Sequence, residues 1–143
     1  MSLHRIIYKS EATVPVDLDV VLSIAEESEP RNRRLGITGL LLATDGHFLQ
    51  ALEGEEQPLG KVYLRITKDS RHTALKMISR GPIERRSFES WGMKGVGLMG
   101  LTDDLCEFLR GKYGAEGDEV RLPAEEPEAL AFFADVRRHL ARG

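Results

Sequence analysis

Residues 36–54 read GITGLLLATDGHFLQALEG, and this stretch decides the fold. Its first part, from Gly36 to Thr44, is almost continuously apolar, which is typical of a strand buried on both faces. Asp45-Gly46 is a two-residue turn signal between two strand-like runs. The residues from His47 to Glu53 then return as a second strand. The stretch therefore predicts a β-hairpin.

The segments on either side of the hairpin predict an α+β fold. We expect strands at residues 3–9, 74–80 and 88–98, a turn at Gly81-Pro82, a helix from the cap at Asp17 to Pro30, and a helix at 57–68. Apolar residues recur at helical spacing in both helices: Leu18, Val21, Leu22 and Ala25, then Leu59, Val62, Tyr63 and Ile66. The order β-α-β-β-α-β-β predicts a ferredoxin-like mixed β-sheet with these two helices on one face.

The last third of the chain predicts two more helices. One begins at the capping sequence Thr102-Asp103-Asp104, and the other begins at Pro127, after a polar link at residues 114–123. We expect these helices to cover the other face of the sheet. The chain then divides into a first domain at residues 1–98 and a C-terminal helical extension at 99–143.

Composition narrows the classes of protein. The chain has 143 residues, one cysteine, and 20 basic against 23 acidic residues, a formal net charge of −3. This charge argues against a nucleic-acid binder, and Cys106 alone makes no internal disulfide. The four histidines lack metal-ligand spacing, so we expect no metal site. Because no apolar run reaches about 18 residues and no signal peptide is evident, we expect a cytoplasmic protein without a membrane partner.

Two polar side chains interrupt rows that otherwise belong to a core. Alternate strand residues share a face, so Tyr8 lies with Ile6, and Gln50 lies with Phe48 and Leu52. A buried amide and a buried phenol both need hydrogen-bond partners. They either face each other or share a polar ligand. An ordinary alternative is that Tyr8 binds a loop carbonyl and Gln50 lies at the end of the sheet.

Other candidate residues also have ordinary structural explanations. Asn32 follows the first predicted helix, where asparagine is common in turns. Arg71-His72 is explained equally well as a solvated loop. Trp91 and Met93 are expected on one face of the last strand, where core packing accounts for both.

The chain resembles a BLUF domain, the flavin-binding sensor of blue light. The resemblance rests on five ordered pieces: RIIYKS at 5–10, NRRLGITGLL at 32–41, FLQALEG at 48–54, DSRH at 69–72 and RRSFESWGM at 85–93. Their order and spacing fit the family over about residues 2–98. The two predicted C-terminal helices further resemble the short, stand-alone members.

The resemblance implies a role for each matching residue. Tyr8 matches the tyrosine that donates an electron and a proton to the excited flavin, and Gln50 matches the glutamine between that tyrosine and the flavin. Asn32 matches the asparagine that hydrogen-bonds the flavin ring. The other implied flavin-binding positions are Ile24, Ile66, Arg71 and His72. Ser10, Trp91 and Met93 match the residues that relay the signal.

The chain departs from the commonest family pattern in three places, one of which is Ala43-Thr44 in place of a frequent tyrosine. Arg31 precedes Asn32 where several relatives have Asn or His, and its guanidinium is long enough to reach the flavin phosphate or ribityl chain. Gly92 stands between Trp91 and Met93 where Ser is common, which would loosen this strand.

The implied function is a blue-light photoreceptor with no enzyme activity of its own. It would bind FAD non-covalently, with FMN or riboflavin as alternatives, and rearrange the hydrogen bonds of Gln50 in light. We expect a downstream effector protein as its partner in trans, and a homo-oligomer. A flavin-free ferredoxin-like interaction module is an alternative. An acylphosphatase-like hydrolase is another, although residues 11–14 do not supply the glycine-rich loop it needs.

Overall fold

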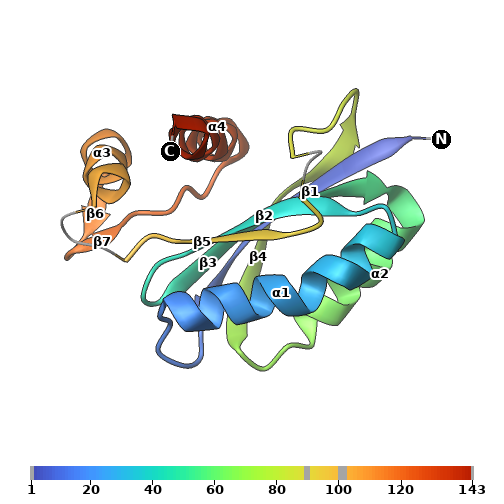
Figure 1. Ribbon diagram of the computed structural model, residues 1–143, viewed down its shortest axis with the longest axis horizontal. Coiled ribbons are helices and arrows are strands. Elements are labelled where there is room, and N and C mark those ends of the chain that lie inside the picture. The colour runs from blue at the N-terminus through green and yellow to red at the C-terminus, as the bar shows by residue number, and fades with distance from the viewer. Residues whose placement is uncertain (1, 89–90, 100–102, 143) are drawn as a thin grey trace.

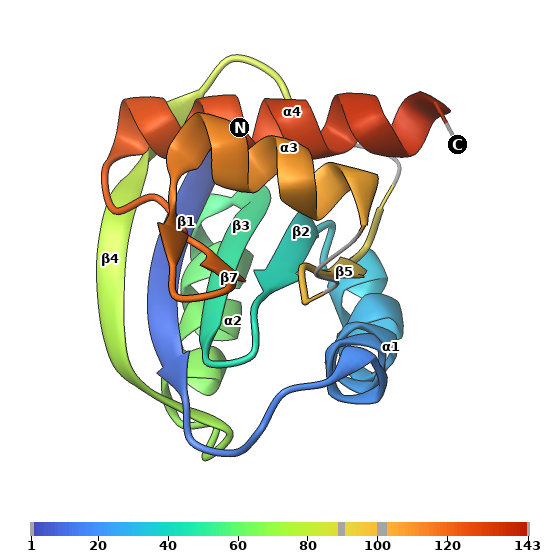
Figure 2. The same ribbon diagram turned by 90° about the vertical axis from the view of Figure 1, so that its left-hand side faces the viewer.

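A computed structural model describes residues 2–88, 91–99 and 103–142 of the chain. A mixed five-stranded sheet forms its middle layer, with two helices on each face (Figures 1 and 2). The sheet strands are β1 (Leu3–Ala12), β2 (Thr38–Ala43), β3 (His47–Glu55), β4 (His72–Ile83) and β5 (Lys94–Gly97), and β6 (Ala115–Glu116) pairs with β7 (Glu119–Val120). The helices are α1 (Leu18–Arg34), α2 (Glu56–Thr67), α3 (Asp104–Tyr113) and α4 (Glu126–Arg142).

The sheet confirms the predicted ferredoxin-like α+β plan. Its strand order is β4-β1-β3-β2-β5, with antiparallel pairing except between β2 and β5, which run parallel. The predicted hairpin is β2–β3, closed where the Thr44 N–H donates to the His47 carbonyl at 2.9 Å. In the β1–β3 register Tyr8 stands opposite Gln50. The two polar residues singled out in the sequence are therefore cross-strand neighbours.

The sheet carries a separate core on each face. On one face Ile6, Leu41 and Leu52 pack against α1 and α2. On the other face Leu40 and Leu49 pack with residues of α3 and α4, as predicted. The uninterrupted apolar run of β2 follows from this double burial, because its alternate side chains enter different cores.

Helix α1 begins where the sequence predicts, but two residues of its predicted apolar face are exposed and the helix ends later than predicted. Asp17 caps it as expected, accepting a hydrogen bond from the Val20 N–H at 3.0 Å, but Leu18 and Leu22 remain 52% and 40% exposed. The prediction that Pro30 ends the helix is wrong, because Pro30 lies inside it. A proline removes one helical hydrogen bond, and burial of Ala25 and Asn32 on either side holds the helix together. This continuation keeps Asn32 in the last turn of α1.

Two further predictions, for Gly81-Pro82 and for residues 88–98, are wrong. Gly81-Pro82 is not a turn but part of β4, an edge strand, where a proline can stand with its missing N–H toward solvent. Residues 88–98 do not form one strand, because only Lys94–Gly97 pairs with β2. The polar link at 114–123 contains the β6–β7 hairpin. Asp103 caps α3 as predicted, and Thr102 lies outside the described residues.

The fully buried carboxylate of Glu53 fastens the segment after β4 to the sheet. It accepts hydrogen bonds from the Arg5 side chain at 3.0 Å and from the backbone N–H groups of Ser87 and Phe88 at 2.9 and 3.0 Å. Arg86 adds bonds to Thr38 and to the Glu53 carbonyl. A buried charge is tolerated when it is paired and fully hydrogen-bonded in this way. The path of the chain toward β5 is therefore fixed at residues 86–88.

Replacing Glu53 tests this anchor. Glu53→Ala leaves the Arg5 guanidinium without its buried partner and two backbone donors unpaired, so we expect a loss of about 3–5 kcal/mol in the free energy of unfolding. Urea denaturation followed by circular dichroism measures it. Glu55→Ala, at an exposed position on the same strand, should change stability by no more than about 0.5 kcal/mol. Equal stability of the two variants would contradict the anchoring role.

Candidate functional site

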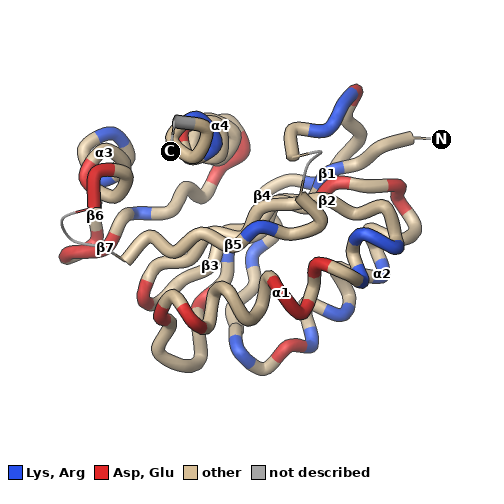
Figure 3. Tube along the Cα trace, in the orientation of Figure 1, with Lys and Arg blue, Asp and Glu red and all other residues tan. Residues whose placement is uncertain are grey.

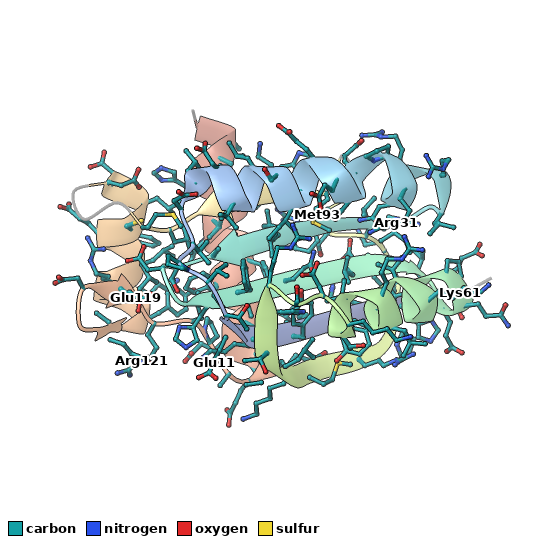
Figure 4. All side chains as sticks on the ribbon, turned by 90° about the horizontal axis from the view of Figure 1, so that it is seen from below. Glu11, Arg31, Lys61, Met93, Glu119 and Arg121 are labelled. Atoms are coloured by element: carbon teal, nitrogen blue, oxygen red, sulfur yellow. The ribbon has the colours of Figure 1, made fainter. Side chains whose placement is uncertain are left out.

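A cleft opens on the sheet between α1 and α2, the side of the molecule seen in Figure 4. Its floor comes from β1, β2 and β3, and its walls come from the two helices and the turn before β4. The cleft brings together all of the residues that the sequence analysis predicts to bind the flavin: Tyr8, Ile24, Arg31, Asn32, Gln50, Ile66, Arg71 and His72. These residues come from positions spread over more than sixty residues of sequence, and only the fold makes them neighbours.

A chain of hydrogen bonds runs across the floor of the cleft. The Tyr8 hydroxyl donates to Gln50 Oε1 at 2.5 Å, and Gln50 Nε2 donates to the Met93 sulfur at 3.3 Å. All three side chains are buried. A thioether can only accept a hydrogen bond, so Met93 requires the amino end of the Gln50 amide and Tyr8 receives its carbonyl end. The orientation of the glutamine is thus set by Met93, because the Tyr8 hydroxyl could also accept a hydrogen bond.

Burial keeps the Tyr8 phenol protonated. Desolvation raises the pKa of Tyr8 far above the ordinary value for tyrosine, with a smaller contribution from Tyr63. The ring lies edge-on to Tyr63 at 6.1 Å and to His72 at 5.9 Å between centroids. Tyr8 therefore acts as a neutral hydrogen-bond donor at physiological pH.

His72 is held by hydrogen bonds at both ring nitrogens. Nδ1 lies 2.7 Å from Ser10 Oγ, and Nε2 lies 2.7 Å from the Ile66 carbonyl oxygen. Because a carbonyl only accepts, Nε2 carries the hydrogen, and in the neutral imidazole Nδ1 accepts from the Ser10 hydroxyl. The hydrogen bond of Ser10 thus goes to His72, beside Tyr8, and connects β1 to the start of β4.

Two polar atoms of residues that line the cleft are buried without a hydrogen-bond partner among the described residues. Asn32 Nδ2 donates to the Gly92 carbonyl at 3.0 Å, but Asn32 Oδ1 has no hydrogen bond. Arg31 Nε is likewise buried and unpaired. A buried polar atom without a partner is costly, and most such atoms in proteins are satisfied. One acceptor and one donor on residues that line the same cleft fit a planar polar ligand such as a flavin.

The arginines around the cleft differ in whether a carboxylate pairs with them. Arg71 pairs with Asp69 at 2.6 Å and Glu27 at 3.3 Å, and its hydrogen bond lowers the pKa of Asp69. Arg31 and Arg65 make no ion pair within the described part of the chain. Desolvation, followed by the nearby charge of Arg65, lowers the pKa of Arg31. Lys and Arg gather at the end of α1 beside α2 (Figure 3), so this end of the cleft suits an anion.

Trp91 and Met93 do not share a face, which corrects the sequence analysis. Met93 belongs to the core under α1, whereas Trp91 packs against the core under α4 and stacks on Phe88 at 6.4 Å. The backbone bends at Gly92, so the side chains on either side of it turn to opposite faces of the sheet. Of the predicted relay residues, only Met93 touches Gln50 through a hydrogen bond in the described structure.

The comparisons with known proteins agree with this geometry. The model of the family described as BLUF, sensors of blue-light using FAD, matches residues 3–94. The chain belongs to the BLUF family. The chain is therefore a flavin-binding blue-light sensor, and FAD is the cofactor of its family.

Solved BLUF proteins share the fold. A structure titled BlrB, a BLUF protein in the dark state, is 29% identical, with a TM-score of 0.74 over 94% of this chain and 95% of that one. A structure of BlrP1 from Klebsiella pneumoniae, titled as holding FMN and cyclic diGMP, is 34% identical, with a TM-score of 0.62 over 76% of this chain and 30% of that one.

Curated relatives are much longer than this chain. The photoactivated adenylate cyclase subunit beta of Euglena longa is 36% identical over 87 residues, which is 61% of this chain and 10% of that relative. The corresponding subunit of Euglena gracilis is 28% identical over 71% of this chain and 12% of its own length. What is shared with these relatives is the BLUF domain.

No helix in the described part of this chain is long and apolar enough to cross a membrane.

Sequence reasoning missed several residues that line the cleft. The sequence assigns Leu41, Phe48 and Leu52 only to the core, although Phe48 and Leu52 stand in the same row as Gln50. Glu27, Ser28, Arg65 and Asp69 also line it. Arg65 directly precedes Ile66, and this neighbour could have drawn attention to it. Glu27 and Ser28 carry no signal in the sequence.

The high pKa of Tyr8 has a consequence for stability in alkali. The folded-state pKa lies above the unfolded value of about 10, so above this pH the unfolded chain loses a proton that the folded protein keeps. The contribution of Tyr8 to the free energy of unfolding is fully present below about pH 10 and falls by about 1.4 kcal/mol per pH unit above it. Urea denaturation of the apoprotein across this range should show a steeper fall for wild type than for Tyr8→Phe, and parallel curves would contradict the assignment. Tyr63 and Tyr113 contribute equally to both proteins.

Proposed function

We propose that this chain is a photoreceptor without enzyme activity that changes the hydrogen bonds of Gln50 in light and signals to a separate effector protein. The observation that carries the proposal is the Tyr8–Gln50–Met93 hydrogen-bond chain beside two unpaired polar atoms in one cleft. Residues 1–98 would sense light, and residues 99–143 would form the extension that a partner reads. The protein would act as a homo-oligomer in the cytoplasm.

The residues around the cleft supply complementary contacts for a flavin. Asn32 Oδ1 is an acceptor for a ring N–H, and its amino group is already held by Gly92. Ile24 and Ile66 offer apolar surface on opposite helices. Arg31 supplies an unpaired donor and a charge for the phosphate or ribityl chain, and Arg71 and His72 complete the rim. When bound, the flavin supplies absorption of blue light and an electron acceptor.

Tyr8 and Gln50 perform the photochemical steps in this proposal. Tyr8 gives up an electron and its phenolic proton and later recovers both, so no lasting bond forms. Because the pKa of Tyr8 is raised, the phenol keeps its proton in the dark. Gln50 then settles with its donor and acceptor ends exchanged, by rotation or by tautomerisation. An amide suits this exchange because its two ends have similar shapes and opposite hydrogen-bonding character.

The exchange has a local consequence at Met93. In the dark arrangement the Met93 sulfur accepts a hydrogen bond from Gln50 Nε2. When the exchange is a rotation of the amide, Oε1 faces a sulfur that carries no hydrogen, and the bond is lost. The segment at 91–93 then keeps the hydrogen bonds of its backbone to Phe88, to the Gly39 N–H and to the Asn32 side chain. This difference between two states is what a partner would read.

The visible spectrum of protein purified in dim light tests the proposal. Wild type should show a flavin band that shifts slightly to the red under blue light and recovers in the dark. Tyr8→Phe and Gln50→Leu should retain flavin and lose the shift, because one removes the proton donor and the other removes the amide that exchanges. Tyr63→Phe, the control, should keep it. A normal shift in either of the first two variants would refute their roles, and a colourless protein after added flavin would favour an interaction module.

Arg31 should decide how strongly the phosphate of the cofactor contributes to binding. Arg31→Gln removes a charge at the cleft, so we expect the affinities for FAD and FMN to fall by about tenfold while that for riboflavin changes little. Flavin fluorescence quenching on titration of the apoprotein measures all three. Arg33→Gln, at an exposed residue paired with Glu29, is the matched control and should affect none of them. An equal loss for riboflavin would place Arg31 away from the phosphate.

A further inference from the structure

A second hollow lies on the opposite face of the sheet from the flavin cleft. It is formed by the segment between β4 and β5 and by the end of α4, which lie beside each other in Figure 2. Ser87, Phe88 and Trp91 come from the segment, Lys94 begins β5, and Arg137, Leu140 and Ala141 come from α4. We refer to these seven residues as the Trp91 groove.

The Trp91 groove has an apolar floor with cations at its edges. Trp91 stacks on Phe88, which packs edge-on against Phe133 at 5.7 Å. Lys94 Nζ lies 5.7 Å from the Trp91 ring, and Arg137 donates to the Ser87 carbonyl. Neither cation forms an ion pair with a described residue, and no described residue that lines the groove is acidic. The two charged side chains among the described lining residues, Lys94 and Arg137, are therefore both cations.

The groove is joined to the flavin cleft through three consecutive residues. Trp91 forms part of the groove, and its carbonyl accepts from the Gly39 N–H at 3.0 Å. The Gly92 carbonyl accepts from Asn32, and the Met93 sulfur accepts from Gln50. Asn32 and Gln50 both line the flavin cleft. The same short segment therefore has one side in each site.

We propose that the Trp91 groove binds an acidic amphipathic segment of the effector protein, and that light weakens this binding. Apolar side chains of the segment cover Phe88, Trp91 and Leu140, and its carboxylates meet Lys94 and Arg137. Aromatic and arginine side chains at the centre of a patch are typical anchors of protein interfaces. The light dependence rests on the function proposed above, because the loss of the Gln50–Met93 hydrogen bond loosens the segment that carries Trp91.

A designed peptide tests the chemistry without knowledge of the effector. The probe is a synthetic amphipathic peptide with leucines on one helical face and glutamates on the other, labelled with a red-absorbing dye. Its counterpart carries lysines in place of the glutamates. Fluorescence anisotropy with the full chain loaded with FAD should show binding of the glutamate peptide in the dark and at least tenfold weaker binding of its counterpart, on the order expected for charge reversal at an interface. Absence of binding, or equal binding of both peptides, overturns the proposal.

Paired charge reversals locate the binding site. The double variant Lys94→Glu with Arg137→Glu should bind the glutamate peptide about tenfold or more weakly than wild type. Lys61→Glu with Lys76→Glu makes the same change in net charge at exposed positions elsewhere and should leave the affinity within about twofold. Lys94→Gln with Arg137→Gln should give a smaller loss, which covers the case in which the glutamate pair disturbs the fold. Equal losses in the groove and control variants overturn the proposal.

Illumination separates the groove from the photochemistry. Under blue light the affinity of wild type should fall by about threefold or more, and Gln50→Leu should show the same affinity in light and dark. A normal red shift with unchanged peptide affinity overturns the light-regulated groove and leaves the photoreceptor function intact. Absence of any red shift in wild type overturns the photoreceptor function itself. Analytical sedimentation of the groove variants measures their oligomeric state. Loss of a homo-oligomer on charge reversal would assign the groove to a second copy of the chain and overturn the proposal.

Discussion

The hydrogen bond between Tyr8 and Gln50 depends on the register in which β1 pairs with β3. Tyr8 stands directly opposite Gln50, and each strand directs its alternate residues into different cores. A shift of one residue would move Gln50 to the α3–α4 face and leave Tyr8 opposite an apolar side chain. The apolar neighbours of both residues therefore hold the polar pair in place. The packing of two cores fixes the position of one buried amide.

The hairpin and the faces of its strands could be predicted because their signals are local. The apolar run of β2, the Asp45-Gly46 turn and the alternation around Gln50 each depend on a few adjacent residues. The cleft residues could be predicted as one set because the five ordered pieces of sequence indicate the BLUF family. The roles of Asn32 and Arg31 also gained physical support from two unpaired atoms that no sequence pattern reveals.

The failed predictions concern residues whose local preference loses to tertiary packing. Pro30 favours the end of a helix, yet α1 continues because Ala25 and Asn32 are buried on either side of it. The sequence at 88–93 has the composition of a strand, yet hydrogen bonds with Glu53, Gly39 and Asn32 hold Phe88 and residues 91–93 in an irregular path. These partners lie about 35 to 60 residues away in the sequence, so no local pattern could place Trp91 and Met93 on opposite faces.

The outer edge of the sheet also limits how copies of this chain can meet. β4 lies at one edge of the five-stranded order, and its free side would ordinarily invite another strand. Pro82 removes a backbone donor there, and the exposed Lys76 and Arg80 add like charges along the same strand. Natural sheets use these features to prevent edge-to-edge aggregation. These features of β4 consequently disfavour an assembly of this sensor in which two copies pair through their β4 edges.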